Sequence, residues 1–251
     1  MRDGLVSIIT PAYRAAAVIE QTITSVLAQT YQNWEMLIAD DCSPDDTRLV
    51  IANWAQRDPR IRLISLPVNS GPAQARNAAL AEAKGRWIAF LDSDDLWLPE
   101  KLARSLEFAQ RHGAALVYTG YRRIDVDGQR NGEFIQVPPR LTYRQLLGNT
   151  AIATSTVLID RRQTGDIRMA QVYYDDFVCW LGILKRGLTA HGLNEDLMRY
   201  RVLPKSVSRN KRRSAREVWK IYRSTEQLGR FAASWHFLNY AARAILKYRK
   251  F

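Results

Sequence analysis

The stretch Ile88-Ala-Phe-Leu-Asp-Ser-Asp-Asp95 joins an apolar run to three closely spaced carboxylates. Such a run is typical of a buried strand, so the carboxylates fall at the strand's end. Residues two apart point the same way in an extended chain, and Asp92 and Asp94 are therefore expected to face together. Paired carboxylates can hold Mg²⁺ or Mn²⁺, which fill their other positions with phosphate oxygens. The stretch thus predicts a metal–diphosphate site.

A simpler interpretation of the same carboxylates is helix capping. Asp94 or Asp95 could cap a helix that begins near Pro99. Capping would explain one carboxylate but not a run of three, so we favour metal binding.

Outward from this stretch, short apolar runs alternate with longer amphipathic ones. Strands are expected at residues 5–10, 34–40, 61–66 and 87–91, and helices at 15–29, 44–57, 72–83 and 99–111. Gly85 is expected to end the third helix and Gly113 the fourth. This alternation predicts an α/β fold, with a mostly parallel central sheet and flanking helices.

The rhythm changes after residue 115. Strands are expected at 116–124, 133–137 and 156–160, with a hairpin turn at Asp127-Gly128, and a helix is expected at 174–185. From Ser214 onward, two helical stretches are rich in Lys, Arg and aromatic residues. The economical division is a catalytic-type α/β domain at 1–210 and a basic amphipathic helical extension at 211–251.

Unusual residues also follow the first two predicted strands, at the edge where open α/β sheets bind ligands. Pro11-Ala-Tyr13 follows the first strand, and Asp40-Asp-Cys-Ser43 follows the second. Together with Asp92, Asp94 and Asp95 they would bring five carboxylates to one edge. Because like charges repel, a cation or a donor-rich ligand is expected there.

Several other site types lack their motifs. No G-x-G-x-x-G follows the first strand and no G-x-x-x-x-G-K-[ST] is present, and the three histidines match neither a zinc site nor a catalytic triad. Haloacid-dehalogenase-type phosphatases also use D-x-D, and Asp175-Asp176 could supply their later acidic pair. Their motif, however, closes the first strand and continues D-G-T, so this alternative is weaker.

Five motifs occur in order and at suitable intervals. They are Ser7-Ile-Ile-Thr-Pro-Ala-Tyr13, Ile38-Ala-Asp-Asp-Cys-Ser43, Asn69-Ser-Gly71 with Ala75-Arg-Asn77, Gly85-Arg-Trp-Ile-Ala-Phe-Leu-Asp-Ser-Asp-Asp95, and Tyr174-Asp-Asp176. Together they resemble the family 2 glycosyltransferases of the GT-A fold, over roughly the first 210 residues. Residues 173–185, Arg199-Tyr-Arg-Val202 and Ser206-Val-Ser208 look most like the teichuronic-acid, capsule and O-antigen branch.

The resemblance implies transfer of a sugar from a nucleotide-sugar, usually a UDP-sugar, with inversion at the anomeric carbon. Asp176 would be the general base, and Asp94, with Asp92, would hold Mn²⁺ or Mg²⁺ on the diphosphate. The implied nucleotide-binding residues are Pro11, Ala12, Tyr13, Asp41, Arg76, Asp92 and Ser93. Without the resemblance, Asp175 and Asp176 would be ordinary helix N-terminal acids, and Asp175 could still be only a cap.

Two departures from the family pattern matter. Cys42 stands where many members have Gly or Asn, so the turn after the second strand must accommodate a side chain. The Q-x-x-R-W motif of processive synthases is absent, and no run of about 18 apolar residues occurs. Single-residue, non-processive transfer is therefore expected.

The charge of the chain is concentrated at one end. Of 37 Lys and Arg residues, 14 lie in 201–251, against 2 of the 25 acids, so this segment carries the whole net charge of +12. A neutral body argues against a nucleic-acid partner. Arg243, Lys247 and Lys250 share a helical face beside an apolar stripe comprising Phe231, Trp235, Leu238, Ala242 and Ile245. That stripe could lie on an anionic membrane or pack on the catalytic domain.

These observations predict a cytoplasmic enzyme of surface-polysaccharide biosynthesis, peripheral at the inner face of the cell membrane, with a glycan or polyprenyl-diphosphate-linked acceptor. The N-terminus does not resemble a signal peptide, and Cys42 and Cys179 match no metal spacing. The rival from another class is a non-catalytic basic protein that binds membrane or nucleic acid. A nucleotidyltransferase is a weaker alternative, because residues 10–14 contain no glycine.

Overall fold

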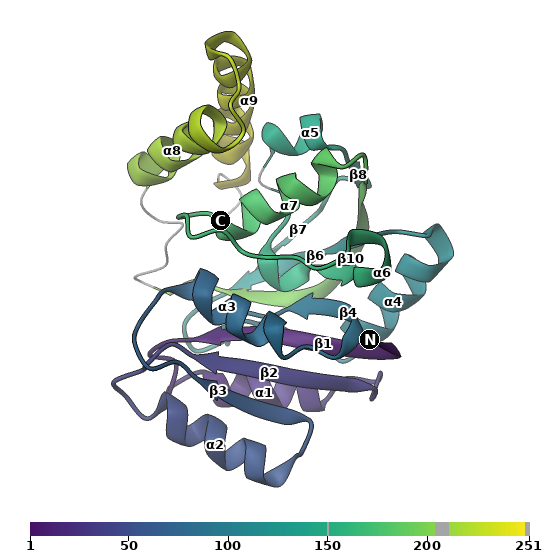
Figure 1. Cartoon of the computed structure of the whole chain (residues 1–251), viewed down its shortest axis with the longest axis vertical. Coiled ribbons are helices and arrows are strands. Elements are labelled where there is room, and N and C mark those ends of the chain that lie inside the picture. Colours follow the sequence, from purple (N-terminus) through teal and green to yellow (C-terminus); the bar gives the residue numbers. More distant parts are fainter. Residues whose placement is uncertain (150, 204–210, 249–251) are drawn as a thin grey trace.

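The computed structural model describes residues 1–149, 151–203 and 211–248, whose strands form one ten-stranded sheet with helices on both faces (Figure 1). The strands are β1 (Arg2–Ala12), β2 (Trp34–Asp40), β3 (Ile61–Ser65), β4 (Gly85–Phe90), β5 (Leu96–Trp97), β6 (Leu116–Ile124), β7 (Asn131–Ile135), β8 (Arg140–Leu141), β9 (Leu158–Asp160) and β10 (Ala190–Arg201). The helices are α1 (Ile19–Leu27), α2 (Thr47–Arg57), α3 (Pro72–Ala81), α4 (Lys101–His112), α5 (Tyr143–Leu147), α6 (Arg161–Thr164), α7 (Asp175–Lys185), α8 (Lys211–Lys220) and α9 (Arg230–Tyr248), with short η1 (Thr154–Thr156) and η3 (Ile221–Thr225).

The first four long strands form the predicted parallel block, in the order β3-β2-β1-β4. Alternate side chains of these strands enter opposite cores, as the pleat requires. Val6 and Ile8 of β1 join the cluster beneath α1, α2 and α4, while Ile9 joins the cluster that includes α3 and α7. Both faces are covered, which explains why the strands read as continuous apolar runs.

The second half of the sheet is mixed. Strand β9 runs antiparallel between β4 and β6, and β6 pairs in parallel with β10. Hairpin β6–β7 confirms the predicted turn. Strand β10 was not predicted, and its pairing register shifts between Leu193 and Asp196 and again before Arg199. These irregularities break the two-residue period by which a strand is recognised.

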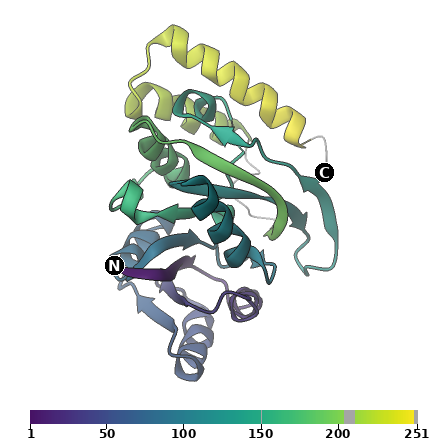
Figure 2. The ribbon, with the colours of Figure 1, turned by 90° about the vertical axis from the view of Figure 1, so that its right-hand side faces the viewer.

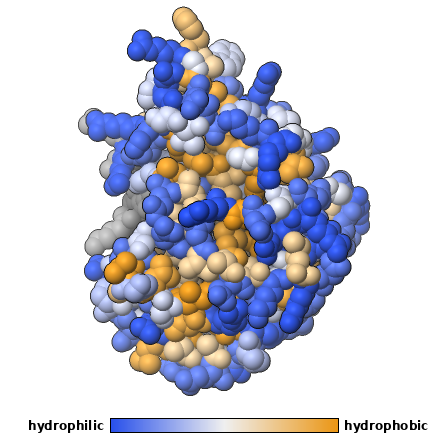
Figure 3. Space-filling model, viewed as in Figure 1, coloured by the Kyte–Doolittle hydropathy of each residue, from blue (hydrophilic) through white to orange (hydrophobic). Residues whose placement is uncertain are grey.

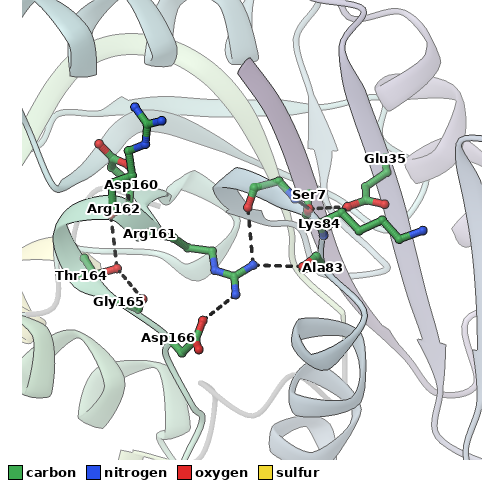
Figure 4. Close-up of polar contacts among 11 residues, drawn as sticks. Ser7, Glu35, Ala83, Lys84, Asp160, Arg161, Arg162, Thr164, Gly165 and Asp166 are labelled. Atoms are coloured by element: carbon green, nitrogen blue, oxygen red, sulfur yellow. Dashed lines mark hydrogen bonds and ion pairs between the residues drawn. The ribbon is translucent and has the colours of Figure 1, made fainter. Parts of the chain in front are cut away.

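Gly85 begins β4 and does not end α3, which stops at Ala81. A Cβ at Gly85 would lie 2.5 Å from the carbonyl oxygen of Leu5, so β1 and β4 approach too closely for a side chain. Polar groups hold the two strands together at this close approach. Ser7 donates to Glu35 at 2.6 Å, and the backbone amide of Lys84 donates to the same carboxylate at 2.7 Å (Figure 4). From the other side, Arg161 donates to the carbonyl oxygen of Ala83 at 3.0 Å.

Two other predicted helix boundaries differ. Helix α1 begins at Ile19 and α2 at Thr47, so Pro44 lies before α2 and not within its first turn. Gly113 ends α4 with a left-handed φ of 57°, as its position predicted.

The C-terminal helices pack on the rest of the chain. Figures 1 and 2 show α8 and α9 beside α5 and α7, away from α2 and β3. Val218, Ile221, Tyr222 and Ala233 belong to the same buried cluster as α3 and α7. The hydroxyl of Tyr222 donates to the carbonyl oxygen of Leu147. One side of this extension is therefore part of the hydrophobic core.

Candidate functional site

The carboxyl ends of β1 and β2 supply the first group of predicted site residues. Pro11 and Ala12 are the last residues of β1 and are buried, whereas Tyr13 is 43% exposed. The guanidinium of Arg14 lies 5.3 Å from the centre of the Tyr13 ring. Of these three residues, Tyr13 is the one that offers an accessible aromatic surface.

Asp41 is buried and anchors the loop before α3. Its two carboxylate oxygens accept hydrogen bonds of 2.8 Å from the backbone amides of Ser70 and Gly71. The side chain of Asn69 donates to the carbonyl oxygen of Asp41 at 3.1 Å. A carboxylate has about four acceptor positions, so these bonds leave lone pairs for a ligand. The structure gives Asp41 a loop-ordering contact that the sequence did not predict.

Cys42 has a φ of 56°, in the left-handed region that favours glycine. The turn after β2 thus has a conformation that Gly or Asn, the residues common at this position in the family that the sequence resembles, adopt readily. The thiol is exposed.

The D-x-D segment follows β4 and is fixed from several directions. The backbone amide of Asp92 donates to Ser155 Oγ at 3.0 Å, and Arg201 Nε donates to the carbonyl oxygen of Asp94 at 2.8 Å. Asp95 is buried and accepts a 2.9 Å bond from the Arg201 amide. The hydroxyl of Thr22 donates to the carbonyl oxygen of the half-buried Ser93 at 2.9 Å.

Helix capping does not account for these carboxylates. Helix α4 starts at Lys101, its N-cap residue is Glu100, and no side-chain cap bond is formed there. Burial, together with the charge of nearby Asp92, raises the pKa of Asp94 to about 6. Burial and the adjacent Asp94 also raise the pKa of Asp95. This crowding of carboxylates is what a bound cation would relieve.

Arg76 occupies the centre of the site. It is buried on α3 and donates to Asp92 at 2.6 Å and to Asp175 at 2.7 Å. Burial alone would lower the pKa of Arg76, but Asp92 and Asp175 raise it above its ordinary value. Arg76 therefore joins two acidic segments that are far apart in sequence.

Asp175 is not a helix cap. Tyr174 is the N-cap residue of α7, and the carboxylate of Asp175 points to Arg76. Burial raises the pKa of Asp175, although the charge of Arg76 opposes the change. The capping role considered for Asp175 is therefore not observed, because the ion pair with Arg76 uses its carboxylate.

Asp176, the predicted base, is half-buried at the start of α7. Thr154 Oγ1 donates to Asp176 Oδ2 at 2.5 Å, and the backbone amide of Phe177 bonds to Oδ1 at 2.7 Å. The next residue in η1, Ser155, holds Asp92 and also accepts a 2.7 Å bond from Trp97 Nε1 at its carbonyl oxygen. Helix η1 thus links Asp176 to the D-x-D segment.

Sequence reasoning missed Thr154, Ser155 and Arg201. No recognisable motif marks η1. Arg201 belongs to the Arg199-Tyr-Arg-Val202 segment, but no role in the site was predicted for it. Residues 204–210, which include Ser206-Val-Ser208 and Arg209, lie outside the described part of the chain. Among described residues, no three or more His, Cys, Asp or Glu side chains form a metal-binding group. Asp92 and Asp94 would hold a divalent cation together with diphosphate oxygens and water as further ligands.

Comparisons with known proteins agree with this architecture. The sequence model described as Glycosyl transferase family 2 matches residues 7–164. TuaG of Bacillus subtilis, named for teichuronic acid biosynthesis, is 46% identical over 97% of each chain. WfgD of Escherichia coli, named as a UDP-Glc:alpha-D-GlcNAc-diphosphoundecaprenol beta-1,3-glucosyltransferase, is 37% identical over 99% of this chain and 96% of its own.

Solved structures share the fold at low sequence identity. TarS of S. aureus, in complex with UDP, has a TM-score of 0.69 and 21% identity, covering 95% of this chain and 71% of that chain. The mannosyltransferase PcManGT of Pyrobaculum calidifontis, in complex with GDP-Man and Mn²⁺, has a TM-score of 0.70 and 19% identity, covering 95% and 73%.

The parallel block with acidic residues at its carboxyl edge and the shared architecture define a glycosyltransferase of the GT-A fold, as predicted. The chain belongs to glycosyl transferase family 2. This membership decides against the phosphatase and nucleotidyltransferase alternatives, and against a non-catalytic scaffold.

Proposed function

We propose that the chain is an inverting, metal-dependent, non-processive glycosyltransferase of surface-polysaccharide biosynthesis. It transfers a sugar from a UDP-sugar to a hydroxyl of a lipid-linked glycan acceptor, at the inner face of the cell membrane. Residues 1–210 form the catalytic domain and 211–251 the basic extension. The observation that carries the proposal is the network joining Asp176, Thr154, Ser155 and the D-x-D segment.

The donor side of the proposed site lies along the carboxyl edge of the parallel block. Pro11, Ala12 and Tyr13 border the nucleobase of the donor, and Asp41 accepts a hydrogen bond from that nucleobase. Arg76, Asp92 and Ser93 lie toward the ribose and diphosphate. This assignment is supported by the shared edge position of these segments and by the accessible ring of Tyr13.

The acidic residues fit a divalent cation. Asp92 is already paired with Arg76, while the raised pKa of Asp94 reflects burial beside another carboxylate. Asp94 is therefore the principal protein ligand in our proposal, and Asp92 the second. When bound, Mn²⁺ or Mg²⁺ would neutralise the charge that develops on the nucleoside diphosphate as it leaves.

Asp176 acts on the acceptor. Its carboxylate removes the proton of the attacking hydroxyl, whose oxygen forms the new bond to the anomeric carbon. The bond from that carbon to the diphosphate breaks at the same time, so the configuration inverts. Thr154 holds one oxygen of Asp176 and leaves the carboxylate half-exposed for this contact.

The names of relatives support the choice of substrates. WfgD is named for a UDP-Glc donor and a diphosphoundecaprenol-linked acceptor, and TarS has been solved with UDP-GlcNAc. PcManGT, in contrast, is solved with GDP-Man, so the fold alone does not determine which nucleobase the donor carries. We favour UDP because the chain resembles WfgD over nearly its whole length.

Thermal unfolding with UDP, GDP, CDP and dTDP, each with and without Mn²⁺, tests the proposal. UDP with Mn²⁺ should raise the melting temperature by about 5–10 °C at about one hundred times the dissociation constant. The other nucleotides should have smaller effects. If no nucleotide stabilises the protein in a metal-dependent way, the proposed donor site is wrong.

A further inference from the structure

Helix α9 presents large apolar side chains to solvent. Phe231, Trp235 and Leu238 are 95%, 67% and 66% exposed, and Ala242 is also exposed. Their spacing of four, three and four residues places them on one side of the helix. We refer to these four residues as the outer face of α9. Such a row of exposed apolar side chains on one helix marks an interaction surface.

The opposite side of α9 accounts for its packing on the protein. Ala233 is completely buried, and Phe237 and Tyr240 pack against the core cluster that includes α7. The members of the predicted stripe from Phe231 to Ala242 are therefore exposed, and α9 packs on the protein through other residues. Ala233, Phe237 and Tyr240 contact the core, whereas no residue of the outer face belongs to the described core.

Basic residues border the outer face. Arg230 and Arg243 lie on its two flanks and are exposed, although the Arg243 guanidinium also donates to the carbonyl oxygen of Gly148 at 3.1 Å, and α9 contains no acidic residue. Neighbouring α8 carries exposed Arg216 and Lys220, and Arg216 lines a shallow apolar hollow with Ala215, Trp219 and Phe237, on the side of α9 away from the outer face. Figure 3 shows hydrophilic side chains over much of this end of the molecule, with apolar ones among them. The surface thus combines apolar anchors with positive charge.

The extension also touches the acceptor side of the proposed site. The guanidinium of Arg213, in the first turn of α8, lies 4.5 Å from the centre of the Tyr173 ring. Tyr173 contacts Tyr174 edge to face, two residues before Asp176. A surface bound by α8 and α9 would therefore lie near the segment that carries the base.

We propose that the outer face of α9 docks the protein on an anionic lipid surface. Phe231, Trp235 and Leu238 enter the boundary between headgroups and acyl chains, and the flanking arginines lie among anionic headgroups. No helix in the described ranges is both long and apolar enough to span a bilayer, which fits a helix lying on the surface. The inference rests on the proposed lipid-linked acceptor, which would be presented at that surface.

Binding of the full chain to vesicles tests this without any need for transfer activity. Sedimentation with vesicles of phosphatidylcholine alone is compared with sedimentation with vesicles that also contain phosphatidylglycerol. The unsubstituted chain should bind the anionic vesicles far better. The triple variant Phe231→Ser, Trp235→Ser, Leu238→Ser should lose more than about 100-fold in partitioning, because these side chains supply the apolar anchor.

Two further variants separate charge from hydrophobicity. Arg230→Gln, on one flank of the outer face, should weaken binding to anionic vesicles by about five-fold, since each basic side chain near such a surface contributes about this factor. Leu49→Ser is the matched control, because Leu49 is an apolar residue, 59% exposed, on the distant α2. Its partitioning should equal that of the unsubstituted chain.

Nucleotide binding and oligomeric state distinguish the other outcomes. Stabilisation by UDP with Mn²⁺ should be unchanged in the triple variant, so loss of vesicle binding with intact UDP binding is the expected result. Equal binding to both kinds of vesicle, or unaltered binding of the triple variant, overturns the docking proposal and leaves the proposed donor site standing. A dimer in sedimentation velocity that the triple variant converts to monomer would instead assign the outer face to a second copy of the chain.

Discussion

The hydroxyl of Thr154 donates a 2.5 Å hydrogen bond to Oδ2 of Asp176, across 22 residues of sequence. The bond joins η1, the short helix before β9, to the start of α7. It fixes one carboxylate oxygen of the proposed base, and the other oxygen accepts a hydrogen bond from the backbone amide of Phe177. Because the neighbouring Ser155 binds the backbone amide of Asp92, η1 contacts both the proposed nucleotide-sugar side and the proposed acceptor side of the site.

Thr154→Val should lower kcat by about 10–100-fold, with little change in the KM for the nucleotide-sugar. Valine keeps the shape of threonine but removes the hydroxyl that orients Asp176, and small misplacements of a catalytic group have effects of this size. Steady-state kinetics of sugar transfer measure the change. Thr154→Ser keeps the hydroxyl and should recover most of the activity; if it is as impaired as Thr154→Val, the hydrogen bond is not what matters.

Asp176→Asn and Asp94→Ala should separate base catalysis from donor binding. Asp176→Asn should retain UDP binding while transfer falls by about 1,000-fold, since a general base contributes 10²–10⁴-fold. Asp94→Ala should weaken the Mn²⁺-dependent binding of UDP by about 100-fold or more, since even groups behind a metal ligand contribute 10–100-fold. Calorimetric titration with UDP and Mn²⁺ measures the second effect.

Glu107→Gln serves as the control for both, because Glu107 lies on the exposed face of α4 and pairs only with arginines of that helix among its described contacts. It should change neither quantity. Equal loss of UDP binding in Asp176→Asn and Asp94→Ala would contradict the proposed division of roles.

The parallel half of the fold could be predicted because its signals are local. Strand β2 and strand β6 have the predicted bounds residue for residue, since β2 holds the apolar run of residues 36–39 and β6 begins on an apolar run and ends before the Asp127-Gly128 turn. Strand β10 was missed because its two register shifts interrupt the pattern. The strand-end carboxylates could likewise be named from their positions, before any contact was known.

The supports of the site could not be predicted, because their partners are remote in sequence. Asp92 and Ser155 are 63 residues apart, and Asp95 and Arg201 are 106 apart. Thr154 and Ser155 have no distinctive composition around them, and only the folded sheet brings them beneath the acidic residues. Capping by Asp175 was a reasonable local inference that a tertiary ion pair with Arg76 overrode.

Arg76→Met should lower the free energy of unfolding by about 3 kcal/mol, because it leaves the buried Asp175 and the half-buried Asp92 without their cation. Urea unfolding measures the change. The double variant Arg76→Met, Asp175→Asn removes one of the uncompensated charges and should recover part of the loss. If the double variant is less stable than Arg76→Met alone, the ion pair with Asp175 is not the source of the effect.

Cys42→Gly should raise the free energy of unfolding by about 1 kcal/mol. The φ of 56° at Cys42 costs a residue with a Cβ about 1–2 kcal/mol, and part of this gain is offset by the greater freedom of glycine in the unfolded chain. Thermal unfolding measures it. Cys42→Ser, which keeps the Cβ, should have little effect, and an equal gain in both variants would show that removal of the thiol is responsible.

Lys101→Met should stabilise the protein more at neutral pH and below than at alkaline pH. Lys101 is completely buried, its Nζ has no hydrogen-bond partner in the described structure, and it lies 4.5 Å from the centre of the Trp97 ring. Burial lowers its pKa to about 7 from an ordinary 10.5.

Between these two pKa values the unfolded chain binds a proton at Lys101 that the folded chain does not, so the free energy of unfolding of the unsubstituted protein should rise with pH across this window. Lys101→Met lacks this contribution, so its stability relative to the unsubstituted protein should fall by about 3 kcal/mol between pH 7 and pH 10. Urea unfolding of both proteins across this range measures the difference, in which the other titrating groups cancel. A difference that does not vary with pH would mean that Lys101 is paired or solvated in the folded state.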